Sequence, residues 1–150
     1  MDVQLICGVE NRARLQKELE EKGFVIKDKA AFIFYEANFS AKKFIFAQDA
    51  RQAISMLKFE DILYFESFDG ETFAVTFDGK YTVREKLYEL EEQLVLRDFC
   101  RISKSDIVNL VRIVKIIPWI GCKLLLELEN GDRVTVTRTY YDDFKKRIGL

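Results

Sequence analysis

Histidine is absent from this chain of 150 residues, which removes several kinds of site at once. Without an imidazole there is no Ser-His-Asp or Cys-His nucleophile, no histidine proton shuttle and no histidine ligand for a metal. Glycine-rich phosphate loops and spaced metal ligands are also missing. The one concentration of carboxylates, Glu60, Asp61 and Glu66, falls in an alternating segment that turns them to different sides. We therefore expect no enzyme activity, no cofactor and no metal.

Cysteine, proline and long apolar runs are scarce as well. The three cysteines, Cys7, Cys100 and Cys122, include no Cys-x-x-Cys pair, so we expect reduced, mostly buried thiols rather than disulfides or a zinc site. The single proline argues against long disordered linkers. No apolar run approaches the roughly 20 residues of a membrane-spanning helix, and the first residues lack the layout of a signal peptide. A cytoplasmic protein with no membrane partner is the default expectation.

Positive charge gathers in the last third of the chain, although the formal net charge is only -1. From Arg97 onward, eleven Lys and Arg residues stand against seven Asp and Glu residues, an excess of four positive charges. The preceding residues carry the opposing excess of five negative charges. Such an asymmetry suits a protein that turns one end toward phosphates.

Residues 1–44 predict a small N-terminal β-α-β-β segment. Leu15 and Leu19 lie four residues apart on one helical face, and Gly23 is a natural residue to end that helix. The expected elements are a strand at 2–7, a helix at 10–22, and strands at 24–26 and 31–35.

Residues 45–150 predict a second domain, mainly β with short helices, which makes the whole chain α+β. Short apolar runs alternate with turn signals, and Asp69-Gly70, Asp78-Gly79 and Asn130-Gly131 indicate hairpins. We expect a helix at 84–96, a tight helical turn at 103–109, and a closing helix at 140–148 that Thr139 caps and whose first turn holds Asp142 and Asp143. The expected strands, of which the first starts just before this domain, are 44–46, 53–57, 62–65, 73–77, 81–83, 99–102, 111–119, 124–128 and 133–137.

Particular residues stand at the joints between these elements. They are Glu60 to Ser67, Val83-Arg84 before spaced leucines, Phe99 to Ser105 with Ile107-Val108-Asn109, Leu128 to Gly131, and Arg138 with Tyr141 and Phe144-Lys145. Taken in this order, they resemble the LytTR family of bacterial DNA-binding domains over residues 45 to 148. The resemblance implies antiparallel β-sheets of the LytTR type, which read duplex DNA from loops rather than from a recognition helix.

The resemblance also implies a set of DNA-contacting residues. Arginine pairs with the O6 and N7 atoms of guanine, lysine contacts guanine or phosphate, and hydroxyl groups hold phosphates. The family commonly has histidine where this chain has Ser103, and an apolar or aromatic residue where it has Asp106, whose carboxylate repels DNA unless it caps the turn or pairs with a base. The implied DNA-binding residues are Asp69, Thr72, Arg101, Ser103, Lys104, Ser105 and Arg138.

Four smaller expectations concern single residues and the first segment. Asn109 follows an apolar pair, and a cap on the backbone is favoured over a base contact. Trp119 is assigned to the core. Cys100 precedes Arg101 in the chain. Because a nearby cation can lower the pKa of a thiol and make it oxidisable, a redox-active Cys100 is a hypothesis. Residues 1–44 are too few, and lack the acidic pair, for a phosphoryl-receiver domain; they either cover a sheet edge or form a homodimer.

The leading interpretation is a sequence-specific DNA-binding transcription regulator without phosphoryl-receiver control. The alternative is a LytTR-like protein-interaction module that antagonises a partner regulator and binds DNA weakly or not at all. Asp106, Ser103 and the near-neutral total charge favour this alternative. The salt dependence of DNA affinity separates the two, because only the first releases counterions.

Overall fold

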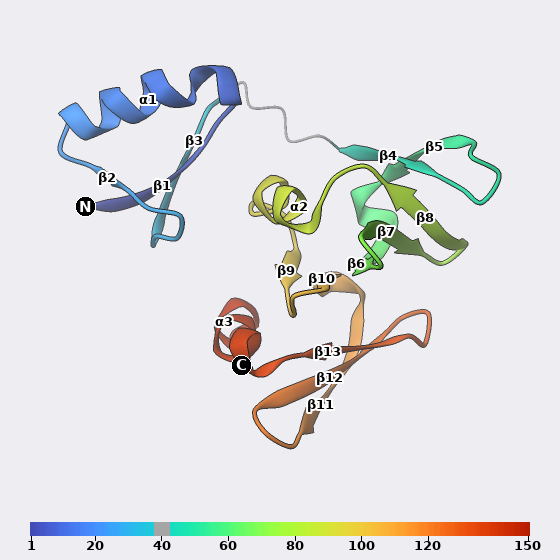
Figure 1. Ribbon diagram of the computed structural model, residues 1–150. Helices are drawn as coiled ribbons and strands as arrows, with labels where there is room; N and C mark the ends of the chain where they lie inside the picture. The colour runs from blue at the N-terminus through green and yellow to red at the C-terminus, as the bar shows by residue number, and fades with distance from the viewer. Residues whose placement is uncertain (38–42) are drawn as a thin grey trace. The chain divides into compact units, whose positions relative to one another are not determined.

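The computed structural model describes residues 1–37 and 43–150 of a chain that divides into two compact units (Figure 1). The N-terminal unit comprises residues 1–42 and the C-terminal unit residues 43–150. Each unit has sheets of its own, and no sheet of the described residues takes strands from both.

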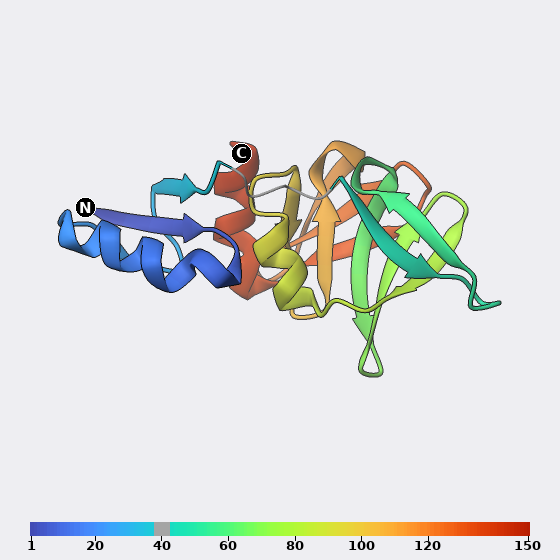
Figure 2. The ribbon, with the colours of Figure 1, turned by 90° about the horizontal axis from the view of Figure 1, so that it is seen from above.

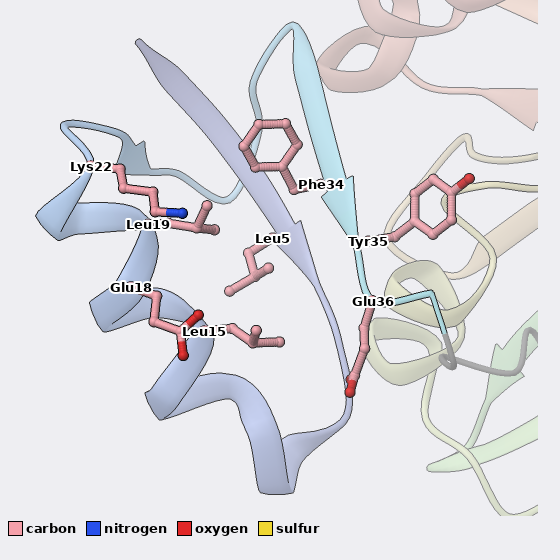
Figure 3. Close-up of a pocket in the computed structure, with 8 residues that line it drawn as sticks. All are labelled: Leu5, Leu15, Glu18, Leu19, Lys22, Phe34, Tyr35 and Glu36. Carbon is pink, nitrogen blue, oxygen red and sulfur yellow. The ribbon is translucent and has the colours of Figure 1, made fainter.

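Parallel strands and one helix form the N-terminal unit, and their order confirms the expected β-α-β-β pattern. β1 (Asp2–Ile6) lies between β2 (Val25–Ile26) and β3 (Phe32–Tyr35), and both neighbours run parallel to it. α1 (Val9–Glu21) packs on the sheet with Leu15 and Leu19 turned toward Leu5 (Figure 3). The apolar spacing in the sequence therefore identified the face of α1 that meets the sheet.

A seven-stranded antiparallel sheet forms the centre of the C-terminal unit, in the order β5-β4-β8-β7-β6-β10-β9. Its connections follow the turn signals of the sequence. In the β6–β7 hairpin, Phe68 pairs with Glu71, and Asp69 and Gly70 between them have φ angles of 52° and 77°. Positive φ at both central residues is the geometry that favours Asp-Gly. The strands are β4 (Phe44–Gln48), β5 (Ile54–Lys58), β6 (Ile62–Phe68), β7 (Glu71–Thr76), β8 (Gly79–Val83), β9 (Phe99–Arg101) and β10 (Asp106–Asn109).

A second, three-stranded antiparallel sheet follows in the order β11-β12-β13. Its strands are β11 (Ile113–Trp119), β12 (Lys123–Leu128) and β13 (Arg133–Val136). The remaining elements are the helices α2 (Leu87–Gln93) and α3 (Arg138–Ile148) and the 3-10 turns η1 (Phe59–Asp61) and η2 (Leu110–Arg112). The mainly β fold with antiparallel sheets and short helices is thus confirmed.

Two apolar clusters occupy the two faces of the seven-stranded sheet. One contains Leu87 and Leu90 of α2, and the other joins the second sheet to Phe144 of α3. β6 contributes to both: Ile62 and Phe65 belong to the first cluster, whereas Leu63 and Tyr64 belong to the second. Because apolar material covers both faces of β6, the sequence there is a continuous apolar run rather than an alternating one. These two cores support the loops described below.

The expected helical turn over residues 103–109 is wrong. Residues 106–109 form β10, which pairs with both β6 and β9. Ile107 and Val108 are buried on opposite faces of the sheet, one in each core cluster. A strand buried on one face is recognised by alternating apolar and polar residues. Because β10 is buried on both faces, this alternation is absent, and the short segment could not be identified as a strand from its sequence.

Both helices of the C-terminal unit differ from expectation at their first residues. α2 covers only Leu87–Gln93; Val83 still pairs with Thr72 in the sheet, and Lys86 is the N-cap of the helix. α3 starts at Arg138 with Thr137 as its N-cap, so Thr139 lies inside the helix and the first turn holds no acidic residue. The cysteines also differ from expectation, since Cys122 is exposed and the other two are half-buried.

Candidate nucleic-acid interface

Four segments of the C-terminal unit meet at one end of its two sheets. The backbone N–H of Ser67 donates to the carbonyl oxygen of Ser105 at 2.7 Å, which ties β6 to the loop between β9 and β10. On the other side of that loop, the N–H of Thr137 donates to the carbonyl oxygen of Ile102 at 3.0 Å. Arg138 Nε in turn donates to the carbonyl oxygen of Gly121 at 3.4 Å. We call residues 68–71, 102–105, 119–122 and 137–138 together the loop end.

Figure 2 shows the β6–β7 hairpin, drawn in green, projecting from the sheet at this end. Asp69 occupies its tip and is exposed. The Lys86 ammonium donates to the carbonyl oxygen of Gly70 at 2.9 Å, so the start of α2 is attached to the same hairpin. Thr72, by contrast, is only 2% exposed and is paired on both sides within the sheet. The hairpin therefore presents Asp69 but not Thr72 to a ligand.

Arg101 holds the β9–β10 loop in place from inside. Its guanidinium donates to the carbonyl oxygens of Ser103 and Lys104, both at 2.6 Å, and to the Glu91 carboxylate at 3.1 Å. Only 15% of its side chain is exposed. Each of the three guanidinium nitrogens thus has a partner within the protein, and the bonds fasten the backbone of Ser103 and Lys104.

Asp106 caps the same loop on its other side. Its Oδ2 accepts hydrogen bonds from the hydroxyls of Ser103 at 3.0 Å and Ser105 at 3.3 Å. Burial raises the pKa of Asp106, and this effect outweighs the two serine hydrogen bonds, which lower it. Ser103 is itself 5% exposed, and its Oγ accepts from the N–H of Ser105 at 3.1 Å. The two departures from the family pattern, Ser103 and Asp106, are therefore bonded to each other in one network.

Some of the predicted contact residues are exposed together at the loop end, whereas others are buried or half-buried. Lys104, Ser105, Arg138 and Asp69 are exposed at the loop end. Thr72 and Ser103 are buried, and Arg101 is half-buried with its guanidinium bonded within the protein. Two further exposed cations, Lys86 and Lys123, lie beside the loop end and were not predicted from the sequence. The exposed cations there are thus Lys86, Lys104, Lys123 and Arg138.

Asn109 and Trp119 lie outside this set, and for both the sequence made a specific prediction. Asn109 is 1% exposed; its amide donates to the carbonyl oxygen of Ile62 at 2.9 Å and its Oδ1 accepts from the N–H of Val111 at 3.3 Å. The expected backbone cap is confirmed. The assignment of Trp119 to the core is wrong, because Trp119 is 60% exposed. Gly121, which stands between the two apolar runs, was the signal that this tryptophan is close to a turn.

A pocket of about 190 Å³ in the N-terminal unit is lined by Leu5, Leu15, Phe34 and neighbouring side chains (Figure 3). Within residues 1–37 and 43–150, no three His, Cys, Asp or Glu side chains are grouped to hold a metal ion. Helices of these residues are too short or too polar to span a membrane. Glu66 is ion-paired with Lys80 and stands apart from Glu60 and Asp61 in η1.

A family model described as the LytTr DNA-binding domain matches residues 52–149, which include every segment of the loop end. The chain belongs to this family. The resemblance drawn from the residues at the joints is thereby confirmed.

Known LytTr proteins agree in sequence and in fold. The sensory transduction protein LytT of Bacillus subtilis (strain 168) is 32% identical over 137 residues, which cover 91% of this chain and 56% of that protein. The transcriptional regulatory protein LytR of Staphylococcus aureus (strain N315) is 34% identical over 97 residues, 65% of this chain and 39% of that protein. A solved LytTr DNA-binding domain from Bacillus cereus superposes with a TM-score of 0.69 at 28% identity, covering 73% of this chain and 99% of that domain.

The chain spans only about half the length of these curated relatives. The match to LytT is longer than the LytTr domain and includes part of the N-terminal unit. The family membership covers the C-terminal unit.

Proposed function

We propose that this protein is a transcription regulator that binds specific sequences of double-stranded DNA with the loop end of its LytTr domain. The observation that carries the proposal is the chain of hydrogen bonds that ties the loops together. Ser67 holds the loop at Ser105, and Thr137 holds it at Ile102. Exposed Lys104 and Arg138 therefore stand on one frame supported by two packed sheets, which suits recognition of a fixed spacing between bases.

The exposed residues Asp69, Lys104, Ser105 and Arg138 of the loop end, and Lys86 beside it, each have a chemical role in this proposal. Arg138 presents a guanidinium for the O6 and N7 atoms of a guanine. Lys104 and the Ser105 hydroxyl contact phosphates or a guanine edge. Asp69, at the tip of the β6–β7 hairpin, accepts from the exocyclic amine of cytosine. Lys86 adds a phosphate contact next to that hairpin, since its ammonium already lies at Gly70.

Selection of bound duplexes from a random library, at moderate salt and with the full chain, tests the proposal. Wild type is compared with Lys104→Ala/Arg138→Ala and with the matched control Lys58→Ala/Arg133→Ala. The control removes the same charge outside the loop end, at the last residue of β5 and the first residue of β13. We expect wild type and control to enrich one common motif that the loop-end variant does not enrich.

The salt dependence of binding gives a second reading of the same variants. Each lost phosphate contact lowers the slope of log K against log salt by about one unit. We expect this reduction for the loop-end variant and not for the control. If well-folded wild type enriches no duplex, the DNA-binding proposal is wrong, and the alternative of a protein-interaction module takes its place.

The N-terminal unit is proposed to pair two copies of the chain. β3 is an edge strand of its sheet, and Phe32 and Tyr35 on it are 55% and 61% exposed. Edge strands with apolar side chains pair readily with another strand, and two linked readers suit repeated DNA sites. Sedimentation equilibrium of wild type and Tyr35→Lys tests this, with a dimer expected only for wild type. A monomeric wild type contradicts it.

We also propose that this unit is not controlled by phosphoryl transfer. Cys7 and Gly8 follow β1, where a phosphoryl-receiver domain places an acidic pair. Incubation with acetyl phosphate and Mg²⁺ is expected to leave the mass and the DNA affinity of the chain unchanged. Incorporation of a phosphoryl group with a change in affinity contradicts this.

A further inference from the structure

An apolar tip stands at the end of the β11–β12 hairpin. Trp119 and Ile120 are 60% and 88% exposed, whereas Leu124 and Leu126 on the next strand are buried. Gly121 and Cys122 complete the turn with φ angles of 78° and 57°, which turn the chain sharply and leave the two large side chains at its outer end. Two adjacent large apolar side chains at an exposed turn indicate a contact surface rather than a core.

The tip is attached to the residue that reads DNA in the proposed function. Arg138 Nε donates to the carbonyl oxygen of Gly121 at 3.4 Å. A Cβ atom added to Gly121 would lie 3.8 Å from a terminal nitrogen of the same guanidinium. Lys123, which is exposed, pairs with Trp119 across the hairpin. The apolar tip is therefore flanked by two cations and lies beside Arg138, not on a separate face.

We propose that Trp119 and Ile120 contact the DNA next to the base read by Arg138, packing on thymine methyl groups and sugars. This inference rests on the proposed function and adds a specificity-determining element to it. Apolar side chains recognise the thymine C5 methyl group, which no other base carries in the major groove. Lys123, which pairs with Trp119 across the hairpin, brings a backbone phosphate close enough for that contact. The tip then selects A·T pairs beside the site of Arg138.

An apolar contact differs from a phosphate contact in its response to salt. Neutral side chains displace no counterions, so their loss lowers affinity by the same factor at every salt concentration. We expect Trp119→Ala to weaken binding by about tenfold, in the range of good base contacts, with an unchanged slope of log K against log salt. Lys123→Ala, which removes the exposed cation paired with Trp119, is expected to lower that slope. The two variants therefore separate an apolar contact from an electrostatic one.

Intrinsic fluorescence observes the tip directly, because Trp119 is the only tryptophan of the chain. The full chain is titrated with the duplex most enriched by wild type, while binding is followed independently by the anisotropy of labelled DNA. We expect the Trp119 emission to change in proportion to bound DNA, and acrylamide quenching to fall. A duplex with uracil in place of thymine, which lacks the methyl groups, is expected to bind more weakly than the thymine duplex to wild type, and this difference is expected to be smaller for Trp119→Ala.

A matched pair of substitutions controls for general effects. Ile120→Ser and Val111→Ser both remove an exposed apolar side chain, 88% and 60% exposed, at opposite ends of β11. Only Ile120→Ser is expected to weaken binding and to relax the preference for A·T pairs in a repeated selection. Neither is expected to change the urea midpoint, because neither side chain lies in the core.

The possible results separate the inference from the function on which it rests. DNA binding without any change in Trp119 emission or quenching overturns the inference and leaves the proposed function intact. A change in emission that depends on protein concentration without DNA assigns the tip to self-association and also overturns it. Absence of any enriched duplex overturns the proposed function, and the inference with it.

Discussion

The hydroxyl of Tyr64 donates a hydrogen bond of 3.0 Å to Oδ2 of Asp132, 68 residues away in the chain. Tyr64 lies on β6 of the seven-stranded sheet, and Asp132 lies in the turn between β12 and β13 of the other sheet. Burial, together with the bond to Asp132, raises the pKa of Tyr64 well above its ordinary value, so the hydroxyl keeps its proton. This bond joins the two sheets at the end opposite the loop end.

Substitution Tyr64→Phe removes that bond and leaves the ring in the core. We expect the free energy of unfolding to fall by about 1–2 kcal/mol, somewhat below the usual range for a bond to a charged group because Asp132 keeps a bond from Asn130. Urea denaturation measures this as a lower midpoint at unchanged slope. Tyr88→Phe is the matched control, since Tyr88 is 69% exposed, and a change of less than about 0.5 kcal/mol is expected there. Equal effects of both substitutions contradict the role of the bond.

Arg101→Lys tests whether this residue positions the loop or contacts DNA through its charge. Lysine keeps the positive charge but cannot reach Ser103, Lys104 and Glu91 at once. We expect DNA affinity to fall about tenfold with an unchanged salt slope, and faster amide hydrogen exchange at Ser105. Arg133→Lys, at an exposed ion pair with Glu127, is the control and should bind normally. Full affinity of Arg101→Lys would show that charge alone matters at this position.

Asp106→Asn removes a negative charge beside the Ser105 hydroxyl. We expect DNA affinity to rise about threefold at low salt and less at high salt, because the lost repulsion is screened. Asp78→Asn, at the far end of β7, is the control with the same charge change and should leave affinity nearly unchanged. A lower affinity of Asp106→Asn would mean that the carboxylate itself accepts a bond from DNA.

The raised pKa of Asp106 also predicts how stability depends on pH. The folded chain holds this proton more tightly than the unfolded chain does, so stability from this group is full below the unfolded pKa of about 3.9. It is lost as the pH rises through the folded pKa. Asp106→Asn lacks this loss, and we expect its stability relative to wild type to be highest at neutral pH and to decline in acid. Urea midpoints of the two proteins across this pH range give the comparison; a constant difference contradicts the prediction.

Asn109→Ala is expected to cost about 1–3 kcal/mol, because it leaves the carbonyl oxygen of Ile62 without its buried donor and the N–H of Val111 without its acceptor. Gln48→Ala, an exposed amide on β4, is the control and should change stability by less than about 0.5 kcal/mol. Thermal unfolding followed by circular dichroism measures both. A small effect for Asn109→Ala would show that water replaces the amide.

Much of the fold follows from local patterns in the sequence. Asp69-Gly70 predicted its hairpin because few other residues adopt positive φ at both central positions. The leucines of α1 predicted the helix and the face that packs. Residues such as Ile107 and Val108 gave no such signal, since burial on both sides of a sheet removes the alternation that reveals a strand.

The sequence by itself determined the family, the mainly β fold and a set of polar residues in three loops, because turn chemistry and apolar spacing are local properties of the chain. Only the tertiary structure decided which of those residues face outward. Arg101 and Lys104 are three positions apart, yet one is bonded to carbonyl oxygens and a carboxylate while the other is exposed. Trp119 lies at a tip beside Arg138 for the same reason. Exposure and proximity arise from packing between segments far apart in the chain, and a local pattern carries no record of that packing.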